Sequence, residues 1–343
     1  MKPLISEGNK AVVVLTCGEP AGIGPELAVK ARARLGHDLP FAWIGDPRYL
    51  PPGTEITEIA HPQQALAVPP GRLPVLVHDF PGHSSPGQPD PADAEAVIEV
   101  IARAVDLVRQ GVALAMTTAP IHKKALKVGA GFAFPGHTEY LAHLAGVDQV
   151  VMMLACPLLR VVPVTIHIPL AQVPHAFTAA LLESTIRITH RALIDDFGLA
   201  SPRLAIAGLN PHAGEGGAMG NEEQRIILPV IGRLVAEGMD IRGPLSADTM
   251  FHEAARQGYD AAICAYHDQA LIPIKTLDFA SGVNVTLGLP FVRTSPDHGT
   301  GFDIAGHGLA DPASLMAALK MARDMGLRRA GLGRQQGMFL GDD

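Results

Sequence analysis

Residues 161–167 read VVPVTIH, an apolar and β-branched run that ends on a histidine. Two further runs of this kind precede histidines, LAIAGL (204–209) before His212 and AAICAY (261–266) before His267. Continuous apolar runs of this length are typical of strands buried on both faces, as in a parallel α/β sheet. Because ligands bind at the carboxyl ends of such strands, we expect the three imidazoles to point toward one crevice.

Three neutral imidazoles can hold a divalent metal and leave coordination positions open for a substrate, as in catalytic metal sites. A single histidine near a buried strand end is more often a hydrogen-bonded core or loop residue. Three equivalent positions favour a metal site made of His167, His212 and His267. Asp248 and Asp268 are candidates for orienting a ligand imidazole or accepting a proton, with a helix cap or turn as the alternative role.

Expected strands and helices alternate along the rest of the chain. A strand over 11–15 leads through the loop 16–24 into a helix that opens at Pro25, and a long amphipathic helix runs from Asp90 to Gly111. This alternation predicts an α/β protein with a mostly parallel sheet and helices on its faces. Since 343 residues exceed the usual size of a single core, we expect either one large α/β unit split into two lobes or two domains.

Composition excludes several classes of protein. The formal net charge is -7 and no Lys/Arg cluster occurs, which argues against nucleic-acid binding but allows a basic pocket for a small anion. The three cysteines form no CxxC pair, so neither a disulfide framework nor a zinc ribbon is expected. No run reaches the roughly eighteen apolar residues of a membrane span, and no signal peptide is evident. We therefore expect a cytoplasmic protein.

Five residues are candidates for binding an anionic substrate. Lys275 and Arg293 lie within apolar sequence, where a charge is costly unless it is paired or meets a ligand. Asn284 places an amide inside a strand-like segment, where it could bind a carboxylate or phosphate. His137 and Thr138 stand at the expected start of a helix, a position that favours anions, although ordinary capping by Thr138 is the alternative.

The glycine-containing loop 18–24, GEPAGIG, could be taken for a phosphate-binding loop because a helix follows it. It lacks the Lys-Ser/Thr pair of a P-loop and the GxGxxG spacing, and Glu19 and Glu26 would repel phosphate. A tight structural turn is therefore favoured. The glycines that follow His212 instead favour backbone that approaches a ligand closely.

Together, six ordered motifs resemble the 4-hydroxythreonine-4-phosphate dehydrogenase family over essentially the whole chain. They are GEPAGIGPE (18–26), FPGHTE (134–139), NPHAGE (210–215), GPLSADT (243–249), YHDQ (266–269) and GVNVTLGLP (282–290). The resemblance implies a two-lobed fold similar to isocitrate and isopropylmalate dehydrogenases, with the active site in the cleft between the lobes. The lobe 1–125 with 280–343 would carry the cofactor, and 126–279 the metal and the dimer contacts.

The segment DHGTGFDIAG (297–306) resembles the adenosine-binding loop of isopropylmalate dehydrogenases, which bind NAD without a Rossmann fingerprint. It implies NAD or NADP as cofactor. The cofactor-binding residues implied by this resemblance are His298, Gly299, Thr300 and Asp303.

The family resemblance also implies site residues and an assembly. His167, His212 and His267 match metal ligands for Zn, Mg, Co or Mn, and the five anion-binding candidates named above match substrate-binding positions. Family members are homodimers with the site at the subunit interface. The metal site would then take two histidines from one subunit and one from its partner, rather than all three from one chain.

The implied reaction is metal-dependent oxidation of the C3 hydroxyl of 4-phosphooxy-L-threonine by NAD(P). The product, 2-amino-3-oxo-4-phosphooxybutanoate, decarboxylates to 3-amino-2-oxopropyl phosphate in pyridoxal 5'-phosphate biosynthesis. Lys275 is a candidate for stabilising negative charge or donating a proton, and Asp248, Asp268 or water for accepting the hydroxyl proton. One alternative is a dehydrogenase of phosphothreonate or phosphoerythronate. A second is a three-histidine zinc hydrolase, although the resemblance to an adenosine-binding loop argues against it.

Overall fold

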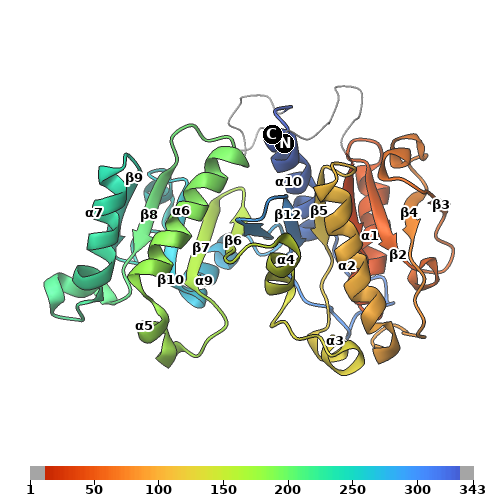
Figure 1. The fold of residues 1–343 in the computed structure, drawn as a ribbon, viewed down its shortest axis with the longest axis horizontal. Helices are drawn as coiled ribbons and strands as arrows, with labels where there is room; N and C mark the ends of the chain where they lie inside the picture. The colour runs from red at the N-terminus through yellow and green to blue at the C-terminus, as the bar shows by residue number, and fades with distance from the viewer. Residues whose placement is uncertain (1–11, 333–343) are drawn as a thin grey trace. The chain divides into compact units, whose positions relative to one another are not determined.

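The computed structural model describes residues 12–332, which divide into two compact α/β units. Residues 12–150 and 289–332 form the first unit, and 151–288 form the second (Figure 1). This division places 126–150 in the first unit and 280–288 in the second, on the other side of the boundaries expected from the sequence. The reason is packing, since α4 (His137–Ala145) contacts α2 (Ala94–Arg109) and 283–287 pair with 151–155. The functional division into a cofactor lobe and a metal lobe stays a prediction.

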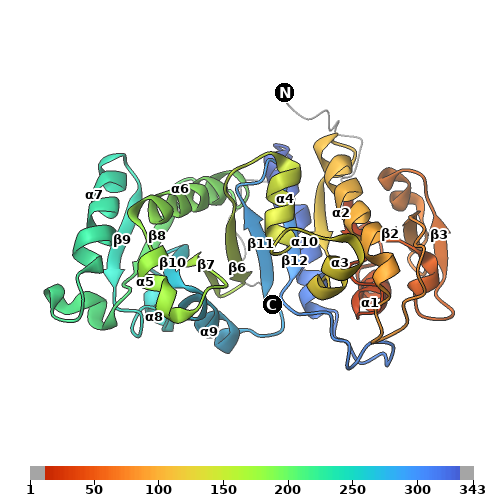
Figure 2. The same ribbon diagram turned by 60° about the horizontal axis from the view of Figure 1, so that its bottom comes forward.

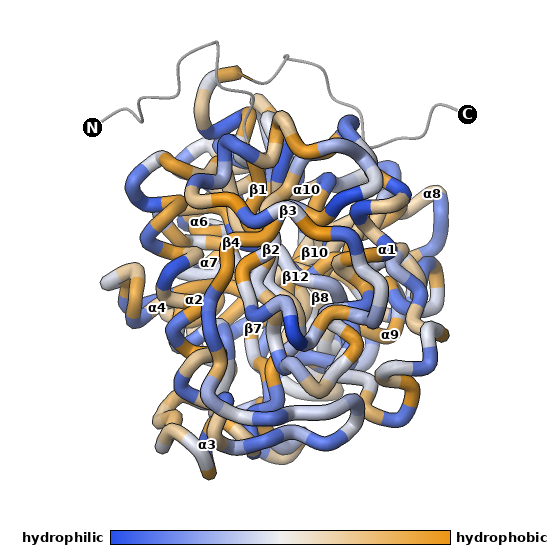
Figure 3. The backbone as a smooth tube through the Cα atoms, turned by 90° about the vertical axis from the view of Figure 1, so that its right-hand side faces the viewer, coloured by the Kyte–Doolittle hydropathy of each residue, from blue (hydrophilic) through white to orange (hydrophobic). Residues whose placement is uncertain are grey.

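The first unit contains a parallel sheet in the order β3-β4-β2-β1-β5-β12. Its strands are β1 (Val13–Thr16), β2 (Phe41–Gly45), β3 (Ile56–Glu58), β4 (Leu73–Val77), β5 (Ala115–Thr118) and β12 (Arg293–Pro296). Apolar stretches recur along β2 and β4 in Figure 3, as expected for strands covered on both faces. The strand expected at the start of the chain is confirmed as the fully buried β1.

Helices cover both faces of this sheet. Figure 1 shows α2 in front of the sheet, with α1 (Gly24–Leu35) and α10 (Ala313–Arg329) behind it. The unit also contains α3 (Lys123–Ala130), α4 and the short 3-10 helices Pro47–Tyr49, Pro62–Ala67 and Pro91–Asp93. Pro25 occupies the first turn of α1, and Asp90 caps the 3-10 turn that leads into α2, as the sequence indicates.

The second unit contains a mixed sheet in the order β11-β6-β7-β10-β8-β9. Its strands are β6 (Val151–Cys156), β7 (Leu159–Thr165), β8 (Arg203–Ala207), β9 (Asp240–Leu245), β10 (Ala261–Tyr266) and β11 (Val283–Leu287). Strand β6 runs antiparallel to both of its neighbours, and β7, β10, β8 and β9 are parallel. The expected α/β class with mostly parallel strands is confirmed.

Helices α6 (Ala179–Asp195) and α9 (His267–Leu277) lie on opposite faces of this second sheet (Figure 2). The other helices are α5 (Val173–Ala176), α7 (Leu228–Ala236) and α8 (Glu253–Arg256), with short helical turns at Leu170–Gln172, Pro211–Gly217 and Glu223–Ile227. No helix among residues 12–332 is both long and apolar enough to cross a membrane.

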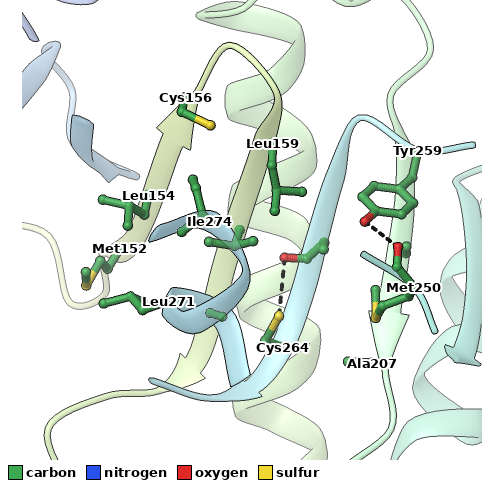
Figure 4. Packing of buried hydrophobic residues seen from close by; sticks show 14 residues of the cluster. Met152, Leu154, Cys156, Leu159, Ala207, Met250, Tyr259, Cys264, Leu271 and Ile274 are labelled. Carbon is green, nitrogen blue, oxygen red and sulfur yellow. Dashed lines mark hydrogen bonds between the residues drawn. The ribbon is translucent and has the colours of Figure 1, made fainter. Parts of the chain in front are cut away.

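The core beneath α9 fixes this helix on the sheet. Figure 4 shows Leu271 and Ile274 of α9 among Leu154, Leu159 and Met152 of β6 and β7. Burying one such side chain contributes about 1.5–3 kcal/mol to folding. The first residue of α9, His267, is therefore held in place at the end of β10.

Candidate functional site

The three histidine-ended runs of the sequence form neighbouring parallel strands, β7, β10 and β8. His167 follows β7, His212 follows β8 in the turn Pro211–Gly217, and His267 begins α9 directly after β10. The ring centroids of His167 and His267 lie 5.6 Å apart with their planes tilted by 45°. Adjacency of the strands thus brings two of the three imidazoles together.

His167 and His212 both have a left-handed backbone, each with a φ of 53°. Ala213 and Glu215 are also left-handed, at 52° and 43°, and glycines occupy the other left-handed positions of this turn. Such a conformation costs about 1–3 kcal/mol per residue and clusters at functional sites. The left-handed residues around His212 therefore indicate that this turn belongs to a functional site.

Two carboxylates lie beside these histidines. Nδ1 of His267 is 2.7 Å from Oδ1 of Asp268, which leaves Nε2 of the ring as the nitrogen for a ligand bond. The hydroxyl of Ser246 donates to Asp248 at 2.5 Å, and this hydrogen bond, with the nearby His212, holds the pKa of the exposed Asp248 carboxyl below its usual value. Asp248 is therefore ionised at neutral pH.

The donor chemistry of these residues fits a divalent metal, because neutral imidazoles oriented by carboxylates are common metal ligands. Within residues 12–332, however, no three His, Cys, Asp or Glu side chains come close enough together to hold a metal. The convergence of all three histidines that strand order alone predicts does not occur in one chain. His167 and His267 make a pair, while His212 lies near Asp248.

The first unit contains a separate cationic cluster around Arg293. The side chain of Arg293 is buried, at 3% exposure, and its Nε and Nη2 donate to the hydroxyl of Thr118 at 3.1 and 2.6 Å. Burial lowers the pKa of this guanidinium to about 10, so it stays charged at neutral pH. A buried charge of this kind is suited to an anionic ligand.

His137, the first residue of α4, faces the same cluster. Its pKa is held well below the usual value by burial and then by the positive charges of Arg293 and Lys123. Its Nε2 is buried and has no hydrogen-bond partner among the described residues. Thr138 follows in the first turn of the helix. A neutral imidazole beside two cations gives this cluster capacity for a further hydrogen bond to an anion.

Lys275 and Asn284 belong to the second unit, so the predicted substrate residues are divided between the units. Lys275 lies on α9, with its Nζ 5.5 Å from the centre of the Phe279 ring, and Asn284 lies on β11 opposite Leu154. Sequence reasoning missed Thr118 and Lys123. Thr118 could have been found as a polar residue at a strand end, whereas the exposed Lys123 carries no signal in the sequence.

The loop 297–306 is hydrogen-bonded to the loop 18–24. The backbone N–H of Ile23 donates to the carbonyl of Thr300 at 2.9 Å, and a Cβ on Gly22 would lie 2.8 Å from the same oxygen. A side chain at Gly22 would therefore push the two loops apart. These contacts agree with the interpretation of 18–24 as a structural turn.

Two side chains of α1 hold the chain just after the same loop. Nζ of Lys30 donates to the carbonyls of Gly308 and Ala310 at 2.9 and 2.6 Å, and Glu26 accepts from the Ala310 N–H at 3.1 Å. Within the loop, Nε2 of His298 is buried and has no partner among residues 12–332. Hydrogen bonds thus hold this segment at Thr300 and again just after the loop.

The buried carboxyl of Glu19, in the loop 18–24, is expected to make the stability of the folded protein depend on pH. The carboxyl is 3% exposed and accepts from the Ala21 N–H, and burial with nearby Asp93 raises its pKa from 4.5 to about 7. The folded state favours the protonated form of Glu19, so the contribution of this group to the free energy of unfolding is greatest below the unfolded pKa of 4.5. The contribution is lost as pH rises through the folded pKa of about 7, and the loss is about 3 kcal/mol.

Glu19→Gln should remove most of this pH dependence when the free energy of unfolding in urea is compared between about pH 5 and about pH 8. Glu95→Gln, at an exposed site of α2, is the matched control, and an unchanged pH dependence in Glu19→Gln would contradict the assignment.

Comparison with known proteins gives these sites a context. Residues 38–322 match the family model described as "Pyridoxal phosphate biosynthetic protein PdxA". The chain is 66% identical over 321 residues to a 4-hydroxythreonine-4-phosphate dehydrogenase of Paracoccus denitrificans, covering 92% of this chain and 98% of that protein. The chain is thus an enzyme of the dehydrogenase class, an oxidoreductase. It belongs to the PdxA family, which confirms the resemblance found in the sequence.

Solved structures agree with this membership. A 4-hydroxythreonine-4-phosphate dehydrogenase from Klebsiella pneumoniae superposes with a TM-score of 0.85 at 36% identity, covering 92% of this chain and all of that one (100%). A terephthalate 1,2-cis-dihydrodiol dehydrogenase from Burkholderia xenovorans has a TM-score of 0.63 at 28% identity, covering 94% and 98%. The fold is therefore shared by dehydrogenases whose names refer to different substrates.

Proposed function

We propose that this chain oxidises the C3 hydroxyl of 4-phosphooxy-L-threonine with NAD or NADP and a divalent metal. The resulting β-keto acid, 2-amino-3-oxo-4-phosphooxybutanoate, loses CO2 to give 3-amino-2-oxopropyl phosphate for pyridoxal 5'-phosphate synthesis. Family membership supports the reaction class. The observation that most supports a phosphorylated substrate is the buried guanidinium of Arg293 near His137, whose Nε2 has no hydrogen-bond partner within residues 12–332.

His167, His212 and His267 would hold the metal, two from one subunit of a homodimer and one from its partner. The pairing of His167 with His267 and the carboxylate at Nδ1 of His267 support this ligand set. The set accepts Zn, Co, Mn or Mg to different degrees. When bound, the metal supplies a Lewis acid for the hydroxyl and the dinucleotide supplies the hydride acceptor.

The protein's own residues bind the charged ends of the substrate and move protons. Arg293 offers a planar fork suited to phosphate or carboxylate, and His137, Thr138, Lys275 and Asn284 complete the proposed substrate contacts. Asp248, ionised at neutral pH, and Asp268 are the proposed acceptors of the hydroxyl proton. Loss of CO2 leaves negative charge on the carbon that carried it, and the Lys275 ammonium is proposed to return a proton there.

His298, Gly299, Thr300 and Asp303 are the proposed dinucleotide contacts. The hydrogen bonds that Ile23 makes to this loop and Lys30 makes to the residues just after it support this assignment, because a fixed loop binds a dinucleotide without the cost of ordering itself. We further propose that the enzyme works in the cytoplasm. The three free, buried cysteines, Cys17, Cys156 and Cys264, are compatible with a reducing compartment.

An assay with purified protein tests the reaction. We expect NADH or NADPH to form only when 4-phosphooxy-L-threonine and a divalent metal are both present, to stop with a chelator and to return with added metal. Phosphothreonate, phosphoerythronate and a terephthalate cis-dihydrodiol, tested side by side, should each give a kcat/KM at least about tenfold lower. Hydrolysis of the phosphoester without a reduced dinucleotide would instead indicate the three-histidine hydrolase.

A further inference from the structure

One buried carboxylate contacts the loop that carries His212. Glu223 is 2% exposed and begins the helical turn Glu223–Ile227. Its Oε1 accepts from the backbone N–H of Asn210 at 2.8 Å, and its Oε2 accepts from the side-chain amide of Asn210 at 3.0 Å. Asn210 therefore holds both carboxylate oxygens just before the turn begins.

The same carboxylate also fits closely against two glycines of this loop. A Cβ on Gly214, where φ is +78°, would lie 2.6 Å from Oε2 of Glu223, and a Cβ on Gly208 would lie 3.3 Å from Oε1. Glu223 thus packs against residues on both sides of His212. Because His212 and its neighbours have left-handed backbones of high energy, surrounding contacts must hold the turn in this form.

Gln269 connects this loop to the strand that ends at His267. Its side-chain oxygen accepts from the Ala265 N–H of β10 at 2.7 Å, and its Nε2 donates to the Gly208 carbonyl at the end of β8 at 2.8 Å. Glu223 therefore packs against Gly208, and Gln269 hydrogen-bonds to the carbonyl of the same residue. The position of the His212 turn is fixed relative to β10 within the second unit.

We propose that Glu223 is a positioning residue that holds the His212 imidazole in place for the metal. This inference rests on the proposed role of His212 as a metal ligand. Burying a carboxylate is costly, and here the described hydrogen bonds to it come from Asn210 alone. A role in specifying one conformation of the His212 turn would explain why a carboxylate is buried here. Outer residues of this kind usually change metal affinity about 10–100-fold when replaced.

The neighbouring Glu222 provides a matched control. Its Oε2 accepts from the same Asn210 amide at 2.7 Å, but the side chain is only partly buried. Glu223→Gln keeps the size of the side chain and puts an NH2 group where an acceptor is needed. Glu222→Gln makes the same chemical change beside it.

The test is Co2+ and Zn2+ titration of the full-length, metal-stripped protein by calorimetry, with thermal unfolding of the metal-free form in parallel. Glu223→Gln should weaken metal binding by at least about tenfold, while Glu222→Gln changes it by less than about threefold. The visible spectrum of bound Co2+ should change in Glu223→Gln as well. If Glu223→Gln does not fold, Glu223→Asp, which keeps the charge, takes its place with the same expected direction.

His212→Ala separates the two hypotheses. If His212→Ala loses the metal and a folded Glu223→Gln binds it as tightly as the unchanged protein, the positioning role is wrong and the ligand assignment stands. If His212→Ala itself keeps the metal, the ligand assignment is wrong, and the positioning role fails with it.

Discussion

Replacing His212 by alanine is expected to abolish metal-dependent turnover while the protein stays folded. His212 is exposed, so its removal leaves no cavity, and alanine already occupies the next left-handed position of the turn. Loss of one of three ligands should weaken metal binding by more than the factor of about 100 seen at the upper end for outer residues. Metal content after dialysis and formation of NADH or NADPH are the two measurements.

The matched control for this variant is His175→Ala. His175 is an exposed histidine of α5 in the same unit, and its replacement should change neither metal content nor rate. A His212→Ala protein that retains both would overturn the metal assignment. Loss of the fold would show up separately in the circular dichroism spectrum.

Replacing Arg293 by lysine is expected to cost most of the affinity for the phosphorylated substrate. Lysine keeps the positive charge but loses the planar fork that donates to Thr118 through two nitrogens. A hydrogen bond to a charged group contributes about 1.5–3 kcal/mol, so losing one such bond to the substrate costs about 10-fold to about 150-fold in affinity. We therefore expect KM for 4-phosphooxy-L-threonine to rise by this factor, with KM for the dinucleotide little changed.

Arg103→Lys is the corresponding control for Arg293→Lys. Arg103 is a partly buried residue of α2 in the same unit, and it donates to the carbonyl of Val77 at 2.8 Å. Its replacement should leave both KM values unchanged. Equal effects of the two substitutions would mean that Arg293 acts on stability rather than on the substrate.

The strand pattern of the sequence was enough to predict neighbouring strands at the candidate metal site. The apolar runs before His167, His212 and His267 are β7, β8 and β10, and they are parallel neighbours, because burial on both faces selects such runs. The antiparallel direction of β6 could not be read from its sequence, since a fully buried strand has the same apolar pattern in either direction.

Contacts between distant residues were beyond the sequence. Nothing in the local sequence around Glu223 or Lys123 indicates that the first meets Asn210 and the second lies near His137, because these contacts depend on how loops return after leaving the sheet. The separation of His212 from the His167 and His267 pair has the same origin. Strand order predicts where a loop begins, and the left-handed turn determines where the side chain ends up.

The first unit is built from two separate stretches of chain, and this has a consequence for synthesis on the ribosome. Strand β12 pairs with β5, but all of residues 151–288 are made between them. The second unit can fold while β5 still presents an unpaired edge, since domains generally fold as units in the order of synthesis. Thr118 lies at that edge and gains its hydrogen bonds from Arg293 only after β12 has been made, so the cluster around Arg293 is among the last parts of the enzyme to form.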